Sequence, residues 1–317
     1  MSDNHDLSRF CPLTYQPLQE TEELYSGVGL RRISRYLTAL KRLPRMEEIR
    51  HRGIEMADRM SIGGVQNKVG AVLHAKEGSF EIVRRNSRYI LKPSTPDWPD
   101  LPANEDLTMR LAAHAGVETP LHGLLWTDDS QLCYFIERFD RTPRGGKLPV
   151  EDFAQILGFD RSTKYRSSME QTARAITKYC SFPVIDRVRL LRRTVVALLT
   201  GNDDMHLKNF SIITDRNGVI SLSPAYDLVN TAILLPDPED LAIPLKGRKR
   251  GVTRQLLVDY FAGEQLGLNE ETVGSVFDEV AGARAGWDDL ITRSFLSEEL
   301  KERYRRLVDE RWERFGL

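Results

Sequence analysis

The hydrophobic pattern of the chain changes character along its 317 residues. In the polar first 60 residues, apolar side chains recur at helical spacing among arginines, at Leu30, Ile33, Leu37 and Leu40. This spacing predicts one amphipathic helix after a polar leader. From residue 61 to 140 the pattern changes to short β-type runs separated by glycine, serine and charged residues, at 69–74, 80–84, 89–92 and 132–139. These runs predict an antiparallel sheet, interrupted by one helix at 104–115 that Gly116 is placed to end.

The second half of the chain has a mainly helical pattern. It predicts helices at 168–179 and 183–199 and three more after residue 252. One hairpin is expected at 210–222, turning at Asn217-Gly218. The segment 141–149 holds two prolines, two glycines and three basic residues, and it is the natural connection between two lobes. We therefore expect an α+β protein with a leader (1–60), a β-rich N-lobe (61–140) and a helical C-lobe (141–317).

Composition narrows the class of protein without naming a ligand. Hydrophobic residues make up 41% and charged residues 29%, as in compact globular proteins. The 45 lysines and arginines balance the 46 aspartates and glutamates, so net charge gives no argument for direct binding to nucleic acid or a membrane. The three cysteines are far apart and predict neither disulfides nor a zinc site. No run approaches the roughly 18 apolar residues of a membrane span. The cytoplasm is expected, and secretion into a host cell is left open.

The densest group of polar side chains follows the 183–199 helix, in the sequence GNDDMHLKNF at 201–210. The hairpin then returns the chain, so Asp204, Asn209 and Asp227 can meet at one point. Amide and carboxylate oxygens suit Mg²⁺ better than zinc, which leaves Asp204 free to orient a hydroxyl and take its proton. A protein kinase uses the same arrangement, with an aspartate base five residues before a metal-binding asparagine. The alternative is that these side chains cap the helix and fill a turn.

Two features of the predicted N-lobe point to a phosphate. Gly63-Gly64 would let backbone amides approach a polyphosphate, or would simply form a hairpin turn. Lys92 ends a strand with apolar neighbours, where a buried ammonium needs an anion; Glu105 is its candidate counter-charge, and the alternative is that Lys92 reaches water. Residues 135–140 end the sheet just before the connection, where a kinase hinge meets adenine.

Six ordered motifs carry a resemblance to a known family. They are S-x-G-G-x-Q-x-K, Y-I-L-K-P, N-E-x-x-x-M-x-L, E-R-F-D-R, G-N-x-D-x-H-x-K-N-F and Y-D-L, within residues 61–230. In this order they resemble the HipA family of serine/threonine kinase toxins. The resemblance implies a two-lobed, protein-kinase-like fold, ATP and Mg²⁺ as cofactors, and a bacterial toxin–antitoxin system linked to persistence.

The resemblance also assigns roles to individual residues. Asp204 matches the catalytic base, Asn209 and Asp227 match magnesium ligands, and Lys92 matches the lysine that holds the ATP phosphates. The remaining ATP-site matches are Gly63, Gly64, Val65, Gln66, Asn67 and Lys68 in the phosphate loop, Glu137 and Phe139 in the hinge, Asp140 near the ribose, and His206, Lys208 and Tyr226 in the nucleotide pocket. Ser61 matches the serine that family members phosphorylate on themselves, which expels the phosphate loop and stops the kinase.

Two departures from the family pattern refine the expectation. Only about 60 residues precede Ser61, too few for the additional N-terminal subdomain of full-length HipA. The chain thus resembles the short HipT form, whose partners are a HipS-like small protein and a HipB-like DNA-binding antitoxin, so DNA is reached only through the antitoxin. Gly63 also replaces the second serine common in that form, so a second phosphorylation there is not expected. The family's known targets are aminoacyl-tRNA synthetases, glutamyl- for HipA and tryptophanyl- for HipT, and only that substrate class is carried over.

Three functions remain in competition. The leading one is a kinase toxin that phosphorylates an aminoacyl-tRNA synthetase and so inhibits translation. The second is a pseudokinase or partner-binding module, against which the joint presence of Lys92, Asp204, Asn209 and Asp227 argues. The third is a small-molecule phosphotransferase of similar fold, which the same residues would serve.

Overall fold

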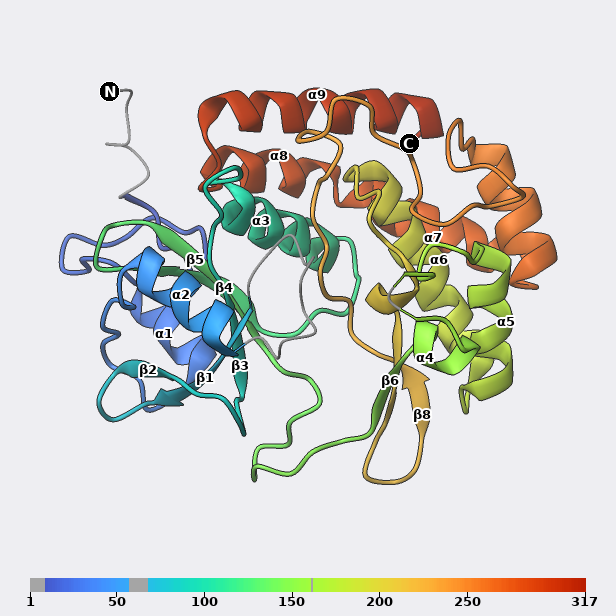
Figure 1. The fold of residues 1–317 in the computed structure, drawn as a ribbon. Coiled ribbons are helices and arrows are strands. Elements are labelled where there is room, and N and C mark those ends of the chain that lie inside the picture. Colours follow the sequence, from blue (N-terminus) through green and yellow to red (C-terminus); the bar gives the residue numbers. More distant parts are fainter. Residues whose placement is uncertain (1–8, 57–67, 161) are drawn as a thin grey trace. The chain divides into compact units, whose positions relative to one another are not determined.

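The computed structural model describes residues 9–56, 68–160 and 162–317 (Figure 1). The chain forms two compact units. The first unit comprises Met1–Leu107, Pro120–Gly145 and Thr292–Ser297; the second comprises Thr108–Thr119, Gly146–Ile291 and Glu298–Leu317. The division into residues 1–60, 61–140 and 141–317 stays a prediction.

The first unit contains a five-stranded antiparallel sheet with the strand order β2-β1-β3-β5-β4. Its strands are β1 (Val69–His74), β2 (Ser79–Ile82), β3 (Tyr89–Lys92), β4 (His122–Trp126) and β5 (Leu132–Glu137). β1 and β3 are confirmed as predicted, while β2 and β5 end two residues earlier than expected. β4 is absent from the prediction because His-Gly-Leu-Leu-Trp is short and does not alternate. In the register, Lys92 lies opposite Tyr134, which fixes where the lysine leaves the sheet.

The predicted amphipathic helix over Leu30–Leu40 is wrong in extent. Helix α1 (Gly27–Ile33) stops where Ser34 turns extended, and α2 (Met46–Met56) forms further along. Leu37 and Leu40 are nevertheless buried, at 3% and 7% exposure, from a segment of turns. Their helical spacing therefore reported burial correctly and backbone conformation incorrectly.

A continuous apolar cluster holds the first unit together. It joins α1 and α2 to the sheet, and it includes three mutually packed aromatic rings, Phe80, Tyr89 and Phe135, with centroids 5.2–6.1 Å apart. Helix α3 (Leu101–His114) begins in this unit and ends in the second. Gly116 follows α3 with a φ of +78°, so the predicted stop is confirmed.

The second unit is mainly helical. Its elements and those shared across the division are α4 (Phe153–Leu157), α5 (Met169–Tyr179), α6 (Pro183–Leu199), the π-helix η3 (Leu256–Gln265), α7 (Glu270–Gly282), α8 (Arg284–Arg293) and α9 (Glu298–Phe315). α6 has the predicted bounds, and Ser168 caps α5 by accepting a hydrogen bond from the Gln171 amide. Residues 252–317, all described, hold four helical segments rather than the expected three, because the ten-residue π-helix does not follow the 3.6-residue period.

A small sheet in the second unit positions the polar loop that follows α6. Its order is β6-β7-β8, with β6 (Val150–Asp152), β7 (Ser211–Thr214) and β8 (Ile220–Leu222). β7 and β8 form the predicted hairpin, and Gly218 takes a φ of +80° in its turn. With strands concentrated in the first unit and helices in the second, the α+β class is confirmed. Within the described ranges, no helix has the length and apolar character needed to span a membrane.

Candidate active site

Lys92 and Glu105 form a buried ion pair in the first unit. Lys92 ends β3 and Glu105 lies in α3, with side-chain exposures of 3% and 0%. The lysine Nζ donates a hydrogen bond to Glu105 Oε1 and also lies 5.4 Å from the centre of the Tyr134 ring. A buried ammonium is stable only when it is paired, and Glu105 supplies that pairing. The fold therefore holds a positive charge in a fixed place at the end of β3.

The residue after Glu105 makes a second buried pair. Asp106 Oδ1 lies 2.7 Å from His122 Nδ1, and both side chains are at most 5% exposed. His122 begins β4, on the other side of β5 from β3. The consecutive carboxylates Glu105 and Asp106 of α3 thus bind Lys92 on β3 and His122 on β4. These two contacts fix α3 against the sheet and so fix the Lys92 ammonium. Sequence reasoning missed this pair, because nothing in the spacing links Asp106 to His122.

The predicted hinge residues close the sheet of the first unit, and arginines engage their carboxylates. Glu137 Oε1 accepts a hydrogen bond from Arg88 Nε at 2.9 Å. Asp140 is bound by Arg138 at 3.0 and 2.9 Å and by Arg141 at 2.6 Å. Phe139 lies half-buried between them in sequence. The hydrogen bonds from these arginines fix the Glu137 and Asp140 side chains and so stabilise the turn that follows β5.

Most of the predicted phosphate loop lies outside the described residues. This applies to Ser61, Gly63, Gly64, Val65, Gln66 and Asn67. Lys68 is described; it is exposed and directly precedes β1.

The polar loop of the second unit starts at a position that only glycine fits. Gly201 follows α6 with a φ of +68°, and an added Cβ would lie 2.5 Å from a Leu307 methyl and 2.7 Å from Asn230 Oδ1. The next residue, Asn202, accepts a hydrogen bond from the Asp204 amide at 3.2 Å. Asn209, at the end of the 3₁₀ turn η2 (Leu207–Asn209), donates its Nδ2 to the Asp204 carbonyl at 2.8 Å. The backbone of Asp204 is therefore held from both sides.

The two adjacent aspartates of this loop have different surroundings. Asp203 Oδ2 accepts the Glu239 amide at 2.9 Å, which is a structural contact within the unit. The Asp204 side chain is 46% exposed, and its Oδ1 accepts a hydrogen bond from Tyr165 at 2.7 Å and lies 3.9 Å from His206 Nε2. The Asp204 carboxylate is thus placed to meet a molecule from solution.

His206 is a buried neighbour of Asp204 and is held neutral. Burial lowers its pKa, and the Lys164 charge lowers it further, while Asp204 and Asp227 act in the opposite direction. Lys164 Nζ lies 2.5 Å from His206 Nε2, which makes that nitrogen the acceptor and leaves the proton on Nδ1. The imidazole therefore serves as a neutral acceptor rather than as a second cation.

The hairpin brings Tyr226 and Asp227 back toward the same loop. The Tyr226 hydroxyl donates to the Lys208 carbonyl at 2.9 Å and lies 2.5 Å from Ser211 Oγ, and burial raises its pKa. Lys208 itself is exposed. Asp227 has a φ of +55°, unusual for a residue with a side chain, and its charge acts on His206 and Tyr226. The chain after the hairpin therefore returns to the 201–210 loop, with Tyr226 bonded to Lys208 and the charge of Asp227 acting on His206.

The donor set of this turn fits a hard cation. Because the Asn209 amide nitrogen is engaged by the Asp204 carbonyl, its Oδ1 is the atom left for a ligand. Within the described ranges no group of three His, Cys, Asp or Glu side chains is placed to hold a metal. One amide and one carboxylate, completed by water and phosphate oxygens, is instead the coordination that Mg²⁺ favours.

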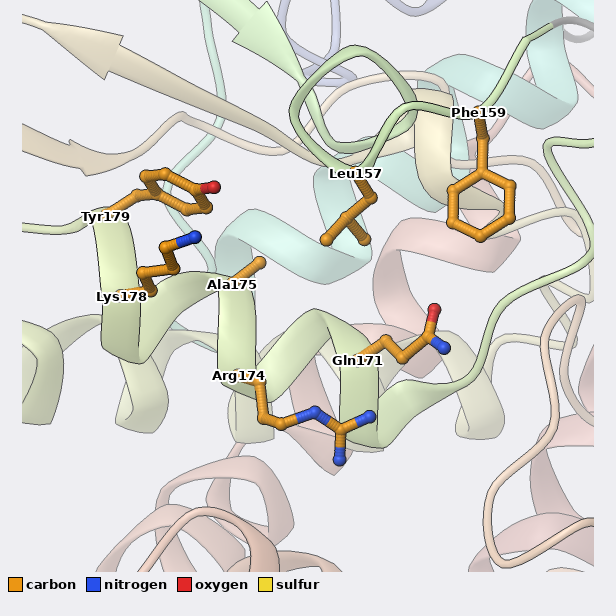
Figure 2. A pocket seen from close by; sticks show the side chains of 7 residues that line it. All are labelled: Leu157, Phe159, Gln171, Arg174, Ala175, Lys178 and Tyr179. Carbon is orange, nitrogen blue, oxygen red and sulfur yellow. The ribbon is translucent and has the colours of Figure 1, made fainter.

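A hollow of about 360 Å³ lies elsewhere in the second unit (Figure 2). Leu157 and Phe159 face it from α4 and the following loop, and the other side chains come from α5: Gln171, Arg174, Ala175, Lys178 and Tyr179. None of the predicted site residues lines it. The predicted site residues therefore lie outside this hollow.

A sheet unit with a buried lysine–glutamate pair and a helical unit with an Asp–Asn–Asp turn define a protein-kinase-like fold. Two solved structures share it. HipA in the Shewanella oneidensis MR-1 complex of HipA, HipB and operator DNA matches with a TM-score of 0.69 and 26% identity, over 88% of this chain and 74% of that one. The Helicobacter pylori proinflammatory kinase CtkA matches in fold, with a TM-score of 0.55 and 15% identity, over 77% and 90%.

The family follows from the sequence comparison. The HipA-like C-terminal domain model matches residues 60–287, well over half of the chain, and the chain therefore belongs to this family. A Haemophilus influenzae protein named "Putative kinase" is 29% identical over 90% of this chain and 92% of its own length. The "Serine/threonine-protein kinase toxin HipA" of Shewanella oneidensis is 30% identical over 59% of this chain. The chain spans about half the length of that toxin, 47%.

Proposed function

We propose that this protein is an ATP- and Mg²⁺-dependent serine/threonine protein kinase that acts as the toxin of a toxin–antitoxin system. The observation that carries the proposal is the half-exposed carboxylate of Asp204 on a backbone held by Asn202 and Asn209. A general base must be fixed in direction yet accessible to a hydroxyl, and Asp204 meets both conditions. Kinship with proteins named as kinases and as a HipA toxin supports the same activity.

In the proposed reaction, the oxygen of a serine hydroxyl forms a bond to the γ-phosphorus of ATP. The bond from that phosphorus to the β,γ-bridging oxygen breaks, and ADP leaves with its electron pair. Asp204 accepts the hydroxyl proton and later returns it to water. Lys92, held by Glu105, would bind ATP phosphates, and Asn209 and Asp227 would hold Mg²⁺, which supplies charge neutralisation for the phosphates.

Regulation and substrate complete the proposal. Ser61 is the proposed autophosphorylation site, the residues 63–68 the proposed phosphate loop, and Glu137, Phe139, Asp140, His206, Lys208 and Tyr226 the proposed contacts for the rest of the nucleotide. An aminoacyl-tRNA synthetase is the proposed substrate. These assignments follow from the family resemblance of the motifs.

The proposed partners are a HipB-like antitoxin and a HipS-like small protein. The Shewanella toxin was solved with HipB and operator DNA, which supports an antitoxin here. The basic run at 246–250 gives little support for direct DNA binding, because Lys249 pairs with Glu239 at 3.1 Å and Arg250 pairs with Asp237 at 2.5 Å.

Cys11, Cys133 and Cys180 are free and buried, which supports a reducing compartment and hence the proposed cytoplasmic location.

Incubation with γ-labelled ATP and Mg²⁺ tests the activity. We expect label on Ser61, and a loss of at least about 100-fold in Asp204→Asn and Asp227→Asn. Asp203→Asn is the matched control: it changes the adjacent aspartate, whose contact is structural, and should retain labelling. Labelling of the Asp204→Asn protein at the wild-type rate would refute the assigned base. Nucleotide binding without transfer would indicate a pseudokinase, and transfer to small molecules alone a phosphotransferase.

Phosphoproteomics of cells that express wild type or Asp204→Asn tests the substrate class. We expect a synthetase serine to gain phosphate only with wild type. If no synthetase changes while labelling occurs in vitro, the substrate assignment fails and the kinase assignment stands.

A further inference from the structure

Tyr165 contacts the proposed base although no sequence motif marks it. It lies in the loop between α4 and α5, 39 residues before Asp204, and its side chain is 41% exposed. Its hydroxyl donates a 2.7 Å hydrogen bond to Asp204 Oδ1. Both residues belong to the second unit.

The ring of Tyr165 is held from several directions. It meets the His206 ring edge-on, with centroids 5.1 Å apart and an interplanar angle of 85°. The ammonium groups of Lys164 and Lys249 lie 4.9 and 5.8 Å from its centre. The Leu207 amide donates to the Lys164 carbonyl at 3.4 Å, which ties the two loops together through their backbones. These contacts together hold the Tyr165 ring in one orientation beside Asp204.

The Tyr165 hydroxyl stays protonated. Burial, followed by the hydrogen bond to Asp204 and the negative charges of Asp204 and Asp203, raises the pKa of Tyr165. The phenol therefore remains a donor to Asp204 throughout the neutral range.

The contact gives the two carboxylate oxygens of Asp204 different surroundings. Asn202 and Asn209 fix its backbone, but only a side-chain contact fixes its χ torsions. Tyr165 engages Oδ1, and within the described ranges no protein group donates a hydrogen bond to Oδ2. Oδ2 is then the atom directed at a substrate hydroxyl.

We infer that Tyr165 is a positioning residue for phosphoryl transfer: its hydroxyl holds Asp204 Oδ1 so that Oδ2 receives the proton of the substrate hydroxyl. This rests on the proposed kinase function. Tyr165 keeps its own proton throughout, and the substrate proton resides on Oδ2. A support of this kind acts on the chemical step, because it orients the base without touching ATP.

The test is Tyr165→Phe, which keeps the ring and its contacts and removes only the hydroxyl. We expect kcat for transfer of the γ-phosphate, measured to Ser61, to purified synthetases and to water, to fall about ten-fold, with the KM for ATP within about two-fold of wild type. Tyr260→Phe is the matched control, since the Tyr260 hydroxyl also donates to a carboxylate of this unit, Glu170 Oε1 at 3.1 Å, away from the catalytic loop. It should leave kcat unchanged.

The possible outcomes separate the two proposals. An active wild type with Tyr165→Phe equally fast, or faster, overturns the positioning role and leaves the kinase intact. The positioning role is also overturned if Tyr165→Phe raises the KM for ATP and lowers the Tm to the same degree as it lowers kcat. A structural role of the hydroxyl would then explain the whole effect. A wild type no more active than Asp204→Asn overturns the kinase function and this inference with it.

Discussion

Two charged sites, one in each unit, are built in opposite ways. Lys92 and Glu105 are at most 3% exposed, and each satisfies the other's charge away from water. Asp204 is 46% exposed, and a tyrosine, not a cation, is its hydrogen-bond donor. For Lys92, the proposed phosphate ligand, an ion pair fixes the ammonium in one place. A base must instead exchange a proton with an incoming hydroxyl, and a neutral donor orients it without removing its charge.

This contrast separates stability from chemistry. Breaking the buried pair leaves an uncompensated charge inside the first unit, so folding should suffer first. Changing the exposed aspartate leaves no buried charge, so activity should suffer first.

The largest expected effect on stability is that of Glu105→Ala. It leaves the Lys92 ammonium buried without its counter-charge, which should lower the free energy of unfolding by about 3–5 kcal/mol in a urea titration. The matched control is Glu48→Ala. Glu48 pairs with Arg52 at 2.6 Å, but both side chains are more than 40% exposed, so the loss should stay below about 1 kcal/mol. Equal losses from the two variants would show that burial of the pair is unimportant.

The hydrogen bond between Asn209 and Asp204 lies within the loop that the sequence singled out, because this contact is short-range. Asp204 and Asn209 are five residues apart, and a single hairpin returns the chain so that Tyr226, next to Asp227, bonds to Lys208. The strand that carries Lys92 was equally accessible, since its apolar run is bounded by turn residues on one side and Pro93 on the other.

What the sequence does not predict is contact between distant segments. Tyr165 reaches Asp204 across 39 residues, from a polar loop whose composition matches any surface turn. Asp106 meets His122 because α3 runs beside two strands, which no local spacing encodes. Helix α1 ends at Ile33 even though the apolar period continues, since turns bury Leu37 and Leu40 equally well. Periodicity thus reports burial, while the partners of a buried or catalytic group depend on tertiary packing.

An intermediate effect is expected at Asn209, a buried residue that holds the Asp204 backbone and is the proposed Mg²⁺ ligand. Asn209→Ala removes both the donor to the Asp204 carbonyl and the Oδ1 available to Mg²⁺. We expect kcat to fall about ten-fold and the Mg²⁺ concentration for half-maximal rate to rise, both read from initial rates in a Mg²⁺ titration. Asn202→Ala is the control, because it loosens the same aspartate from the other side without offering a metal ligand. A similar Mg²⁺ requirement in both variants would remove Asn209 from the metal site.

The smallest effect concerns the loop that carries Tyr165. Asp160 is fully exposed, and hydrogen bonds from Ser162 and Thr163 lower its pKa from 3.8 to about 2. Because the folded value lies below the unfolded one, this turn contributes its full stability above about pH 4 and loses it as the pH falls toward 2. Carboxyl NMR should show the Asp160 midpoint near 2 in wild type and nearer 3.8 in a Ser162→Ala/Thr163→Ala double variant.

At pH 7, Asp160→Ala should lower kcat by no more than about two-fold, less than Tyr165→Phe, because the loop keeps its contacts through Lys164 and Tyr165. A loss as large as that of Tyr165→Phe would mean that the turn, and not the hydroxyl, orients the base.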